Sequence, residues 1–178
     1  MPARGGPARQ LTVDPARNWF PSWSPDGRHI AYERGFGGGK SGIWVVPASG
    51  GEARFLAPGA FVDWSPSGDW LAIQHDGELH RVSADGSQKQ ILLPKGKDPN
   101  VLQFSRDGQA LFFSVVAGPR EKHDIWSLSL RDGTISRLTA LQGRRGRLGY
   151  FFAADARYLY VTWYEDESDI WVMDVTNE

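Results

Sequence analysis

The chain has 178 residues, and 20 Lys and Arg residues against 21 Asp and Glu residues leave a formal net charge of −1. This length fits one ordinary domain with enough chain to bury a core. The near-neutral balance argues against a nucleic-acid-binding protein that works by neutralising phosphates. The absence of cysteine excludes disulfides, thiol nucleophiles and zinc–thiolate sites.

The N-terminal residues carry no targeting signal that we recognise. Residues 1–10 are rich in Gly, Pro and Arg and contain no apolar segment typical of a signal peptide. We expect residues 1–8 to form a disordered tail and residues 9–178 to form a single domain. No apolar run approaches the roughly 18–20 residues of a membrane-spanning helix, so we also expect no membrane insertion.

One motif recurs four times along the chain. It reads Trp-Ser-Pro-Asp-Gly at residues 23–27 and is followed by Ile-Ala-Tyr at residues 30–32. Further copies begin at residues 64 and 104, and a degenerate copy begins at Phe152, so successive copies are 41, 40 and 48 residues apart. Such regular spacing indicates a repeat architecture.

Two other motifs alternate with the first. Ile-Trp-Val-Val at residues 43–46 has counterparts at 79–82, 125–128 and 170–173, and a glycine turn followed by an apolar run ends each of the first three units. Each unit therefore holds four short runs rich in β-branched and aromatic residues, and no segment shows helical periodicity. Four antiparallel strands with a period of about 40–45 residues are typical of one blade of a β-propeller. The sequence predicts an all-β fold with blades at approximately 18–56, 59–92, 100–139 and 148–175.

The quoted motifs, from Trp-Ser-Pro-Asp-Gly to the glycine turn, resemble the WD40-like repeat of TolB-type β-propellers. The resemblance covers residues 9–175 and is weakest in the fourth unit, where Ala153 and Ala154 replace Ser and Pro. It implies an interaction platform, often periplasmic or otherwise outside the cytoplasm, or attached to enzymes and sensors. Because no signal peptide is visible, the sequence leaves the location unknown.

The two ends of the chain suggest how a ring would close. The fourth unit stops after its third strand, and residues 9–12, Arg-Gln-Leu-Thr, resemble the Arg-Leu-Thr of residues 137–139 in a fourth strand. We therefore predict four blades closed by residues 9–12, which complete the last blade and remove an exposed edge. A part of a larger propeller, or a protomer that assembles into one, is the alternative to the expected monomer.

The tryptophans divide into periodic and non-periodic positions. We interpret Trp23 and Trp64 as wedges between blades. The other periodic tryptophans, Trp44, Trp126 and Trp171, are expected in the core. Trp19, Trp70 and Trp163 lie outside this register, and Trp19 and Trp163 are the aromatic candidates for ligand contact.

Charged residues gather on the loops of the face that has the most irregular sequence. The candidate binding residues besides Trp19 and Trp163 are Lys95, Lys97, Arg144, Arg145, Arg147, Tyr150, Glu165 and Asp166. One interpretation is a bipolar rim that captures the acidic group or terminus of a peptide or protein partner. The alternative is a set of solvated loop charges that keep the protein soluble.

Residue patterns that would carry catalysis are sparse. The spacing of the four histidines brings none of them together, and the chain has no Gly-x-Ser-x-Gly elbow. The glycine run at residues 35–40 lacks the spacing of a phosphate loop. We therefore predict no catalytic residues, no metal and no cofactor, and a non-enzymatic propeller that binds a protein or peptide. The alternatives are a small lyase or hydrolase, the accessory propeller of a prolyl oligopeptidase-type peptidase, or a scaffold without a ligand.

Overall fold

The computed structural model describes residues 7–13, 15–35, 42–116, 123–141, 147–155, 158–164 and 168–174. For residues 116, 123, 147, 150 and 168–174 it describes the backbone only. Every regular element within these ranges is a β-strand. Accordingly, none of these ranges contains a helix long and apolar enough to cross a membrane.

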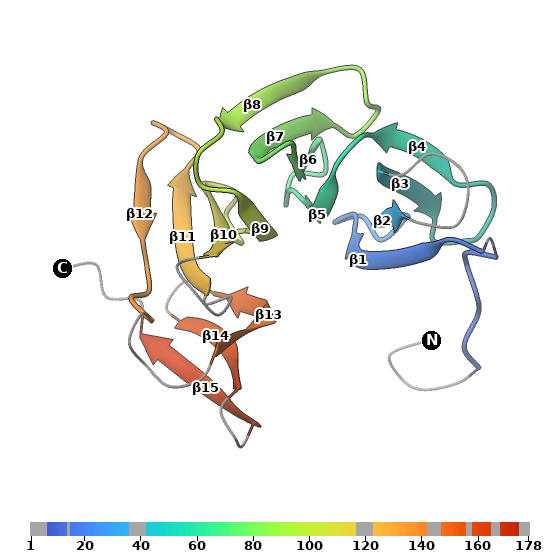
Figure 1. Ribbon diagram of the computed structural model, residues 1–178. Coiled ribbons are helices and arrows are strands. Elements are labelled where there is room, and N and C mark those ends of the chain that lie inside the picture. Colours follow the sequence, from blue (N-terminus) through green and yellow to red (C-terminus); the bar gives the residue numbers. More distant parts are fainter. Residues whose placement is uncertain are drawn as a thin grey trace.

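The strands form four antiparallel sheets that follow the chain as the four blades of a propeller (Figure 1). Blade 1 consists of β1 (Arg17–Trp23), β2 (His29–Gly35), β3 (Gly42–Pro47) and β4 (Arg54–Ala57). Blade 2 consists of β5 (Ala60–Trp64), β6 (Trp70–His75), β7 (Glu78–Ser83) and β8 (Lys89–Leu93). Blade 3 consists of β9 (Pro99–Phe104), β10 (Ala110–Val116), β11 (His123–Ser129) and β12 (Ile135–Arg137). Blade 4 consists of β13 (Arg147–Ala154), β14 (Tyr158–Tyr164) and β15 (Ser168–Asp174). The predicted all-β, four-bladed architecture is confirmed.

The Pro-Asp-Gly motif makes the turn between the first two strands of a blade, as the sequence predicts. The Ser24 hydroxyl donates to Asp26 Oδ1 at 2.6 Å, and the same oxygen accepts the Arg28 backbone N–H at 2.9 Å. These hydrogen bonds, that from Ser24 above all, lower the pKa of Asp26. Gly27 follows with a φ of 69°, in the left-handed region that glycine adopts without steric cost.

The fourth unit has a shorter first turn than the other three. Trp23 pairs with Ile30 across the turn of blade 1, whereas Leu159, the counterpart of Ile30, pairs with Ala154. The Asp155 N–H closes this turn onto the Tyr158 carbonyl at 2.9 Å. The structural counterpart of Trp23 in blade 4 is therefore Ala154, and the sequence-based alignment to Phe152 is wrong by two residues.

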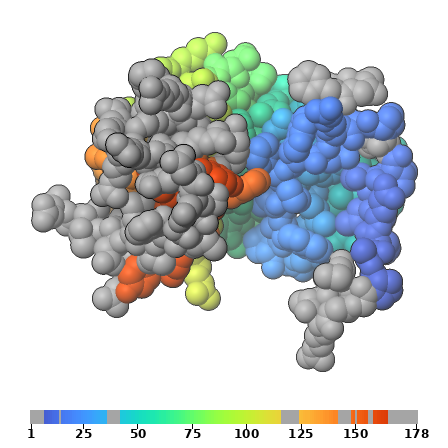
Figure 2. All heavy atoms as spheres, turned by 60° about the horizontal axis from the view of Figure 1, so that its bottom comes forward, coloured from blue at the N-terminus to red at the C-terminus, as the bar shows by residue number. Residues whose placement is uncertain are grey.

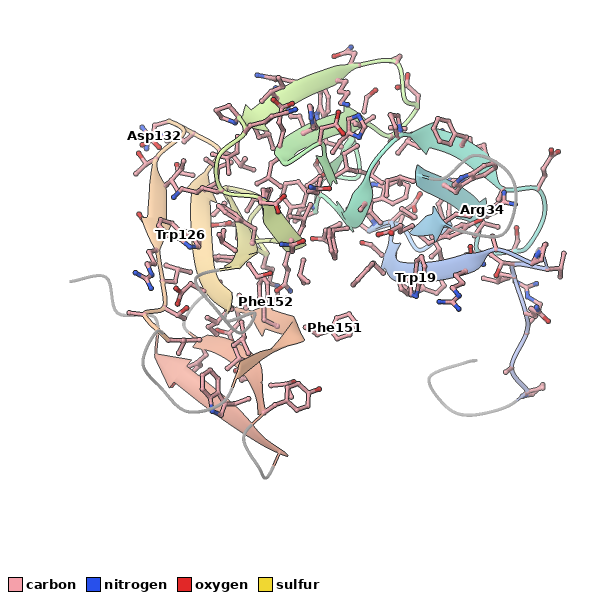
Figure 3. All side chains as sticks on the ribbon, in the orientation of Figure 1. Trp19, Arg34, Trp126, Asp132, Phe151 and Phe152 are labelled. Atoms are coloured by element: carbon pink, nitrogen blue, oxygen red, sulfur yellow. The ribbon has the colours of Figure 1, made fainter. Side chains whose placement is uncertain are left out.

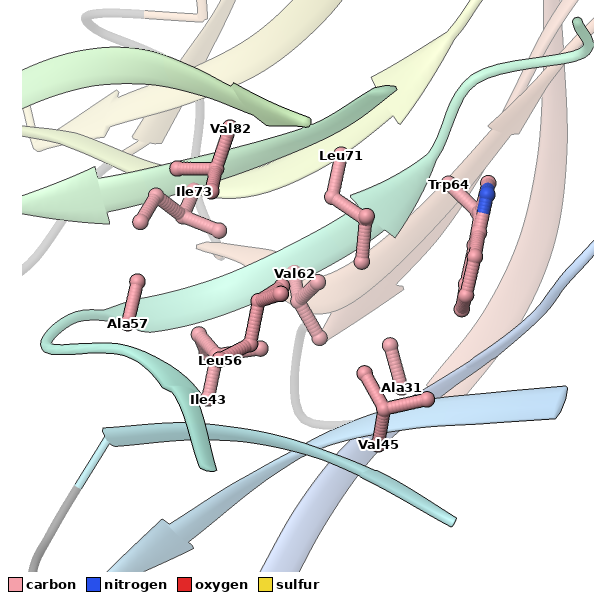
Figure 4. Packing of buried hydrophobic residues seen from close by; sticks show 10 residues of the cluster. All are labelled: Ala31, Ile43, Val45, Leu56, Ala57, Val62, Trp64, Leu71, Ile73 and Val82. Carbon is pink, nitrogen blue, oxygen red and sulfur yellow. The ribbon is translucent and has the colours of Figure 1, made fainter. Parts of the chain in front are cut away.

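Each pair of consecutive blades encloses its own hydrophobic cluster. Between blades 1 and 2, Ile43 and Val45 pack against Leu71 and Ile73 (Figure 4). Similar clusters join blades 2 and 3 and blades 3 and 4. Trp64 belongs to the first cluster and is 8% exposed, which confirms its prediction as an inter-blade wedge.

A hydrogen bond crosses each of these three junctions at the same repeat position. In each of blades 1 to 3, the side chain of the residue just before the motif tryptophan position accepts a hydrogen bond. The donor is the backbone N–H of the residue at the tryptophan position in the following blade. The three pairs are Ser22 Oγ with Trp64 N at 3.0 Å, Asp63 Oδ2 with Phe104 N at 2.7 Å, and Gln103 Oε1 with Ala154 N at 3.0 Å. We call these the junction hydrogen bonds. The equivalent residue of blade 4 is Ala153, whose side chain has no acceptor.

Residues 9–12 do not complete the fourth blade in this structure. They form no strand, and the sheet of blade 4 consists of β13, β14 and β15. The Arg9 guanidinium instead donates to the carbonyls of Ala48 and Ser49 in blade 1. Leu11 packs against a cluster of blade 1 that contains Tyr32. The N-terminal segment therefore covers part of blade 1, and the predicted closure is not present.

Candidate functional site

The inner strands of all four blades line one small pocket, which we call the axial pocket. Its volume is about 170 Å³. The lining residues come from equivalent positions just before the motif tryptophan or its counterpart. They are residues 20–22 of β1, 61–63 of β5, 101–103 of β9 and 151–152 of β13. The repeat thus places equivalent positions of the four inner strands around a common centre, three from each of β1, β5 and β9 and two from β13.

The first position of each lining set is apolar and lies three residues before the motif tryptophan or its counterpart. Phe20, Phe61, Val101 and Phe151 occupy it. The rings of Phe20 and Phe61 are tilted, with centroids 4.8 Å apart, and the rings of Phe20 and Phe151 are 5.9 Å apart. Phe151 projects from β13 toward blade 1 and is 65% exposed (Figure 3). These aromatic rings form an apolar wall that remains partly open to solvent.

Among the described residues, blade 4 contacts blade 1 near the middle of the molecule. Figure 2 shows the orange part of blade 4 reaching the blue first blade there, in agreement with the contact between Phe151 and Phe20. In Figure 1, by contrast, β15 and β1 lie on opposite sides of an opening in the ring of ribbons. The axial pocket is therefore the place where the first and last blades meet.

Three of the four apolar wall residues have an unusual backbone conformation. Phe20, Phe61 and Val101 have φ values of 49°, 48° and 35°, in the left-handed region. Each lies at or beside an irregularity in the pairing of its inner strand, as expected for β-bulges that re-aim side chains. Such conformations cost about 1–3 kcal/mol each and occur preferentially at functional sites.

Asp63 supplies a carboxylate to the pocket lining. Its Oδ1 accepts the Ser22 hydroxyl at 2.9 Å, and its Oδ2 accepts the Phe104 N–H of the junction hydrogen bond. Burial raises the pKa of Asp63 to about 6, although these hydrogen bonds favour the ionised form. Desolvation is thus the dominant effect on this carboxylate.

The chemistry of the axial pocket suits an apolar side chain. Its polar residues Ser22, Asp63 and Gln103 already serve the junction hydrogen bonds, whereas the exposed ring of Phe151 has unused apolar surface. Pockets for cofactors and drug-sized ligands usually measure about 300–1,000 Å³, so 170 Å³ is small for such molecules. The size and lining favour a single protruding side chain of a partner.

The sequence-predicted residues lie elsewhere in the structure. Trp19 is half-buried, and its ring lies beside Gly35, where a Cβ would meet it at 3.1 Å. Lys97 Nζ lies 3.7 Å from the centre of the Trp126 ring, a cation–π contact between the loop that connects β8 to β9 and strand β11. Lys95 is exposed. None of these three belongs to the axial pocket.

The remaining predicted residues fall into three groups. Arg144, Arg145, Glu165 and Asp166 lie outside the described residues. Arg147 and Tyr150 lie on β13, where only their backbone is described. Trp163 is only 7% exposed and packs with Leu159 and Val161 in the cluster between blades 3 and 4. Trp163, an aromatic candidate for ligand contact in the sequence, is therefore a core side chain in this structure.

The second correction among the tryptophans concerns Trp23. The sequence predicts it as a wedge between blades, yet its side chain is 58% exposed. Its pairing with Ile30 directs it to the side of blade 1 opposite blade 2, where the described chain places no preceding blade. A wedge residue needs a blade on both sides, and the described residues place only one blade, its own, beside Trp23.

His80 is a packing residue in this structure. His80 is buried, and its Nε2 lies 3.1 Å from Glu78 Oε2 without hydrogen-bond geometry. Burial is the main cause that lowers its pKa, so the imidazole is neutral at neutral pH. Within the described ranges, no three His, Asp or Glu residues are grouped so that they could hold a metal ion.

Sequence reasoning missed Phe20, Phe61 and Phe151 because it concentrated on charged loops. The signal was present, since an apolar residue precedes each motif tryptophan, or its counterpart Phe104, by three positions. The same rule fails in the fourth unit unless Ala154 is taken as the counterpart of Trp23. Only the strand register reveals that shift.

No protein-family model matches the chain. Among curated proteins, it is 29% identical over 129 residues to the uncharacterized protein YidR of Escherichia coli (strain K12), covering 62% of this chain and 31% of that protein. It is 24% identical over 140 residues to dipeptidyl-peptidase 5 of Porphyromonas gingivalis, covering 66% of this chain and 20% of the peptidase. The aligned region thus spans less than a third of either relative.

Solved structures share the fold. A putative TolB from Agrobacterium tumefaciens superposes with a TM-score of 0.68 at 19% identity, over 85% of this chain and 59% of that one. A puromycin-hydrolyzing peptidase of Mycobacterium tuberculosis superposes with a TM-score of 0.71 at 13% identity, over 94% of this chain and 29% of that one. At these identities the likeness shows the fold alone. The structural match to TolB and to peptidase propellers agrees with the resemblance seen in the repeat motifs.

Proposed function

We propose that the protein is a non-enzymatic β-propeller module that binds a protein or peptide, and that the axial pocket receives an apolar side chain of this partner. The observation that carries the proposal is the exposed ring of Phe151 beside Phe20 in a pocket whose backbone is held in strained conformations. Exposed aromatic rings at the centre of a concave site are the usual anchors of protein recognition.

The partner's chemistry can be tested with a phage-displayed library of random linear peptides, selected on the immobilised protein. We expect the enriched peptides to share an aromatic or large aliphatic residue. Phe151→Ser should weaken their binding by about tenfold or more, the loss expected for a hot-spot side chain. Ile91→Ser is the matched control, because Ile91 on β8 is also an exposed large apolar residue, at 51%, but lies outside the pocket. Equal losses in both variants, or no loss in Phe151→Ser, would contradict the proposal.

A second candidate function is a propeller that works beside a peptidase domain. The similarity to dipeptidyl-peptidase 5 and the coverage of 94% of this chain by the mycobacterial peptidase structure favour it. In either function, we expect the chain alone to have no hydrolase activity. The test is the release of coumarin from an aminoacyl-coumarin substrate. Activity that remains with the protein after repurification would overturn the non-enzymatic assignment.

A further inference from the structure

The lining of the axial pocket contains a single ionisable side chain, that of Asp63. Its carboxylate lies where three blades meet, because it accepts the Ser22 hydroxyl of blade 1 at 2.9 Å and the Phe104 N–H of blade 3 at 2.7 Å. Among the described residues, no lysine, arginine or histidine forms an ion pair with it. The pocket therefore holds a carboxylate that no described cation neutralises.

Asp63 retains the capacity to accept a further hydrogen bond. An ionised carboxylate offers about four acceptor positions on its two oxygens. The Ser22 hydroxyl and the Phe104 N–H occupy one position on each oxygen, and the Trp64 N–H also favours the ionised form. Burial nevertheless raises the pKa of Asp63 to about 6, so these bonds do not fully replace the water that the carboxylate loses.

The open acceptor position and the aromatic wall together limit which side chain fits. Lysine and arginine carry several donors each, and burying them beside one acceptor position would leave donors without partners, which is costly. Phenylalanine and leucine supply no donor and would cover the carboxylate without replacing its water. Tyrosine supplies one O–H at the end of a ring that can pack against phenylalanine. Tryptophan also has one donor, but a volume of about 170 Å³ favours a single ring over two fused rings.

We propose that the partner side chain in the axial pocket is a tyrosine, whose ring packs against the phenylalanine wall and whose hydroxyl donates to the Asp63 carboxylate. Because the pocket must first receive a partner side chain, this assignment rests on the proposed function. Phe151 then supplies affinity that any aromatic side chain would share, whereas Asp63 discriminates in favour of the hydroxyl. A hydrogen bond to an ionised acceptor is stronger than one between neutral groups.

A competition between three peptide libraries tests the proposal. Each library is random except for a fixed central residue, which is tyrosine, phenylalanine or lysine, and equal amounts are selected together on the immobilised protein. We expect the tyrosine library to be enriched over the other two. The dissociation constant of a selected peptide should rise about tenfold at a pH of about 7.5 when phenylalanine replaces its tyrosine, as expected for the loss of a hydrogen bond to a charged group.

Asp63→Asn separates the role of the charge from that of the fold. The variant keeps an oxygen that can accept the Phe104 N–H, and it should lose most of the preference for tyrosine. It should bind the phenylalanine peptide at least as well as the wild type does, because covering a neutral amide costs less than covering a carboxylate. A damaged fold would weaken both peptides, and thermal melts check for it. Asp85→Asn is the matched control, since Asp85 is exposed and lies outside the pocket.

The pH dependence of binding to the wild type needs no variant. The phenylalanine peptide covers Asp63 without a donor, so its affinity should fall as the pH rises from about 5 to about 7.5 and the carboxylate ionises. The tyrosine peptide should keep its affinity, so the preference for tyrosine grows with pH. In Asp63→Asn the preference should not change with pH, although the other titratable groups remain. On the strands packed against β5, these groups are Arg17, His29, Tyr32, Glu33, Arg34 and His75.

Two kinds of negative result have different meanings. If the tyrosine and phenylalanine peptides bind equally at every pH and Phe151→Ser weakens both, the axial pocket remains the binding site and the assignment of tyrosine is overturned. Preferential enrichment of the lysine library would overturn it as well. If no library is enriched, or if Phe151→Ser retains full binding, the proposed function itself fails.

Discussion

Trp64 and Trp23 occupy the same position of the same motif and have opposite environments. Trp64 is 8% exposed, stacks near His29 with ring centroids 6.4 Å apart, and donates its indole N–H to the Gly68 carbonyl at 2.9 Å. Trp23 is 58% exposed. The difference shows that the motif specifies the shape of a blade, whereas the burial of the motif tryptophan depends on the blade before it.

The junctions inside the chain and its open ends differ in hydrogen bonding as well. Each internal junction buries a hydrophobic cluster and satisfies one backbone N–H through a side chain of the preceding blade. At the end of blade 4, Ala153 interrupts this series. A direct contact between blades 4 and 1 would thus lack a junction hydrogen bond, which agrees with the open arrangement of the ribbons in Figure 1.

The largest expected effect compares the two tryptophans directly. Trp64→Ala should reduce the free energy of unfolding by about 3–5 kcal/mol, because it opens a cavity between blades 1 and 2. Trp23→Ala should cost less than about 1 kcal/mol, as expected for an exposed side chain. Urea denaturation of the two variants beside the wild type measures both values. Similar losses in the two variants would show that Trp23 is buried in solution and that the ring is closed there.

A smaller, pH-dependent effect is expected at the junction between blades 2 and 3. The pKa of Asp63 is raised from 3.8 to about 6 in the folded state. Between these values the folded protein binds more protons than the unfolded chain, so the contribution of Asp63 to stability falls as the pH rises. Asp63→Asn removes this titration and keeps an oxygen that can accept the Phe104 N–H.

The melting temperature of Asp63→Asn relative to the wild type should therefore increase as the pH is raised from about 4 to about 7. Differential scanning fluorimetry in a matched buffer series measures this difference. Asp26→Asn is the control. The pKa of the exposed Asp26 carboxylate is lowered, so replacing Asp26 by Asn should make the protein less stable. A difference that stays constant or decreases with pH would show that desolvation does not dominate at Asp63.

The smallest expected effect concerns the N-terminal segment. The sequence predicts that residues 9–12 close the ring, and their removal would then lower the melting temperature sharply. In the structure, Leu11 is a half-buried side chain on the surface of blade 1. We therefore expect Leu11→Ala to cost about 1 kcal/mol or less, and deletion of residues 1–12 to lower the melting temperature only modestly. A loss of several kcal/mol in urea denaturation would favour the closing strand.

Much of the fold follows from local sequence signals. The Ser-Pro-Asp-Gly turns, the alternating apolar residues and the period near 40 residues predict four blades, because each signal acts within one hairpin. The candidate site is less accessible to such reasoning. Trp163 breaks the tryptophan periodicity and is nevertheless buried. It lies on the face of its strand that packs against blade 3, together with Leu159 and Val161.

The register of blade 4 shows where local reasoning stops. The spacing of the motif aligns Phe152 with Trp23, but strand pairing aligns Ala154, because a turn two residues shorter closes through the Asp155 N–H and the Tyr158 carbonyl, as Ser24 and His29 close the turn of blade 1. That shift brings Phe151 to the position of Phe20 and Phe61, and thus into the axial pocket. Sequence spacing does not distinguish the two registers, since both keep apolar residues on one face of the strand.

The sequence by itself determined the repeat, the strand-rich composition and the number of blades, because these depend on interactions between residues close together in the chain. The tertiary structure decided which tryptophans are buried, which inner-strand residues meet at the axis and where residues 9–12 lie. These features depend on contacts between blades, where each side chain is buried or exposed according to the presence of a neighbour. Trp23 and Trp64 show this most clearly, because the same motif residue is exposed in blade 1 and buried in blade 2.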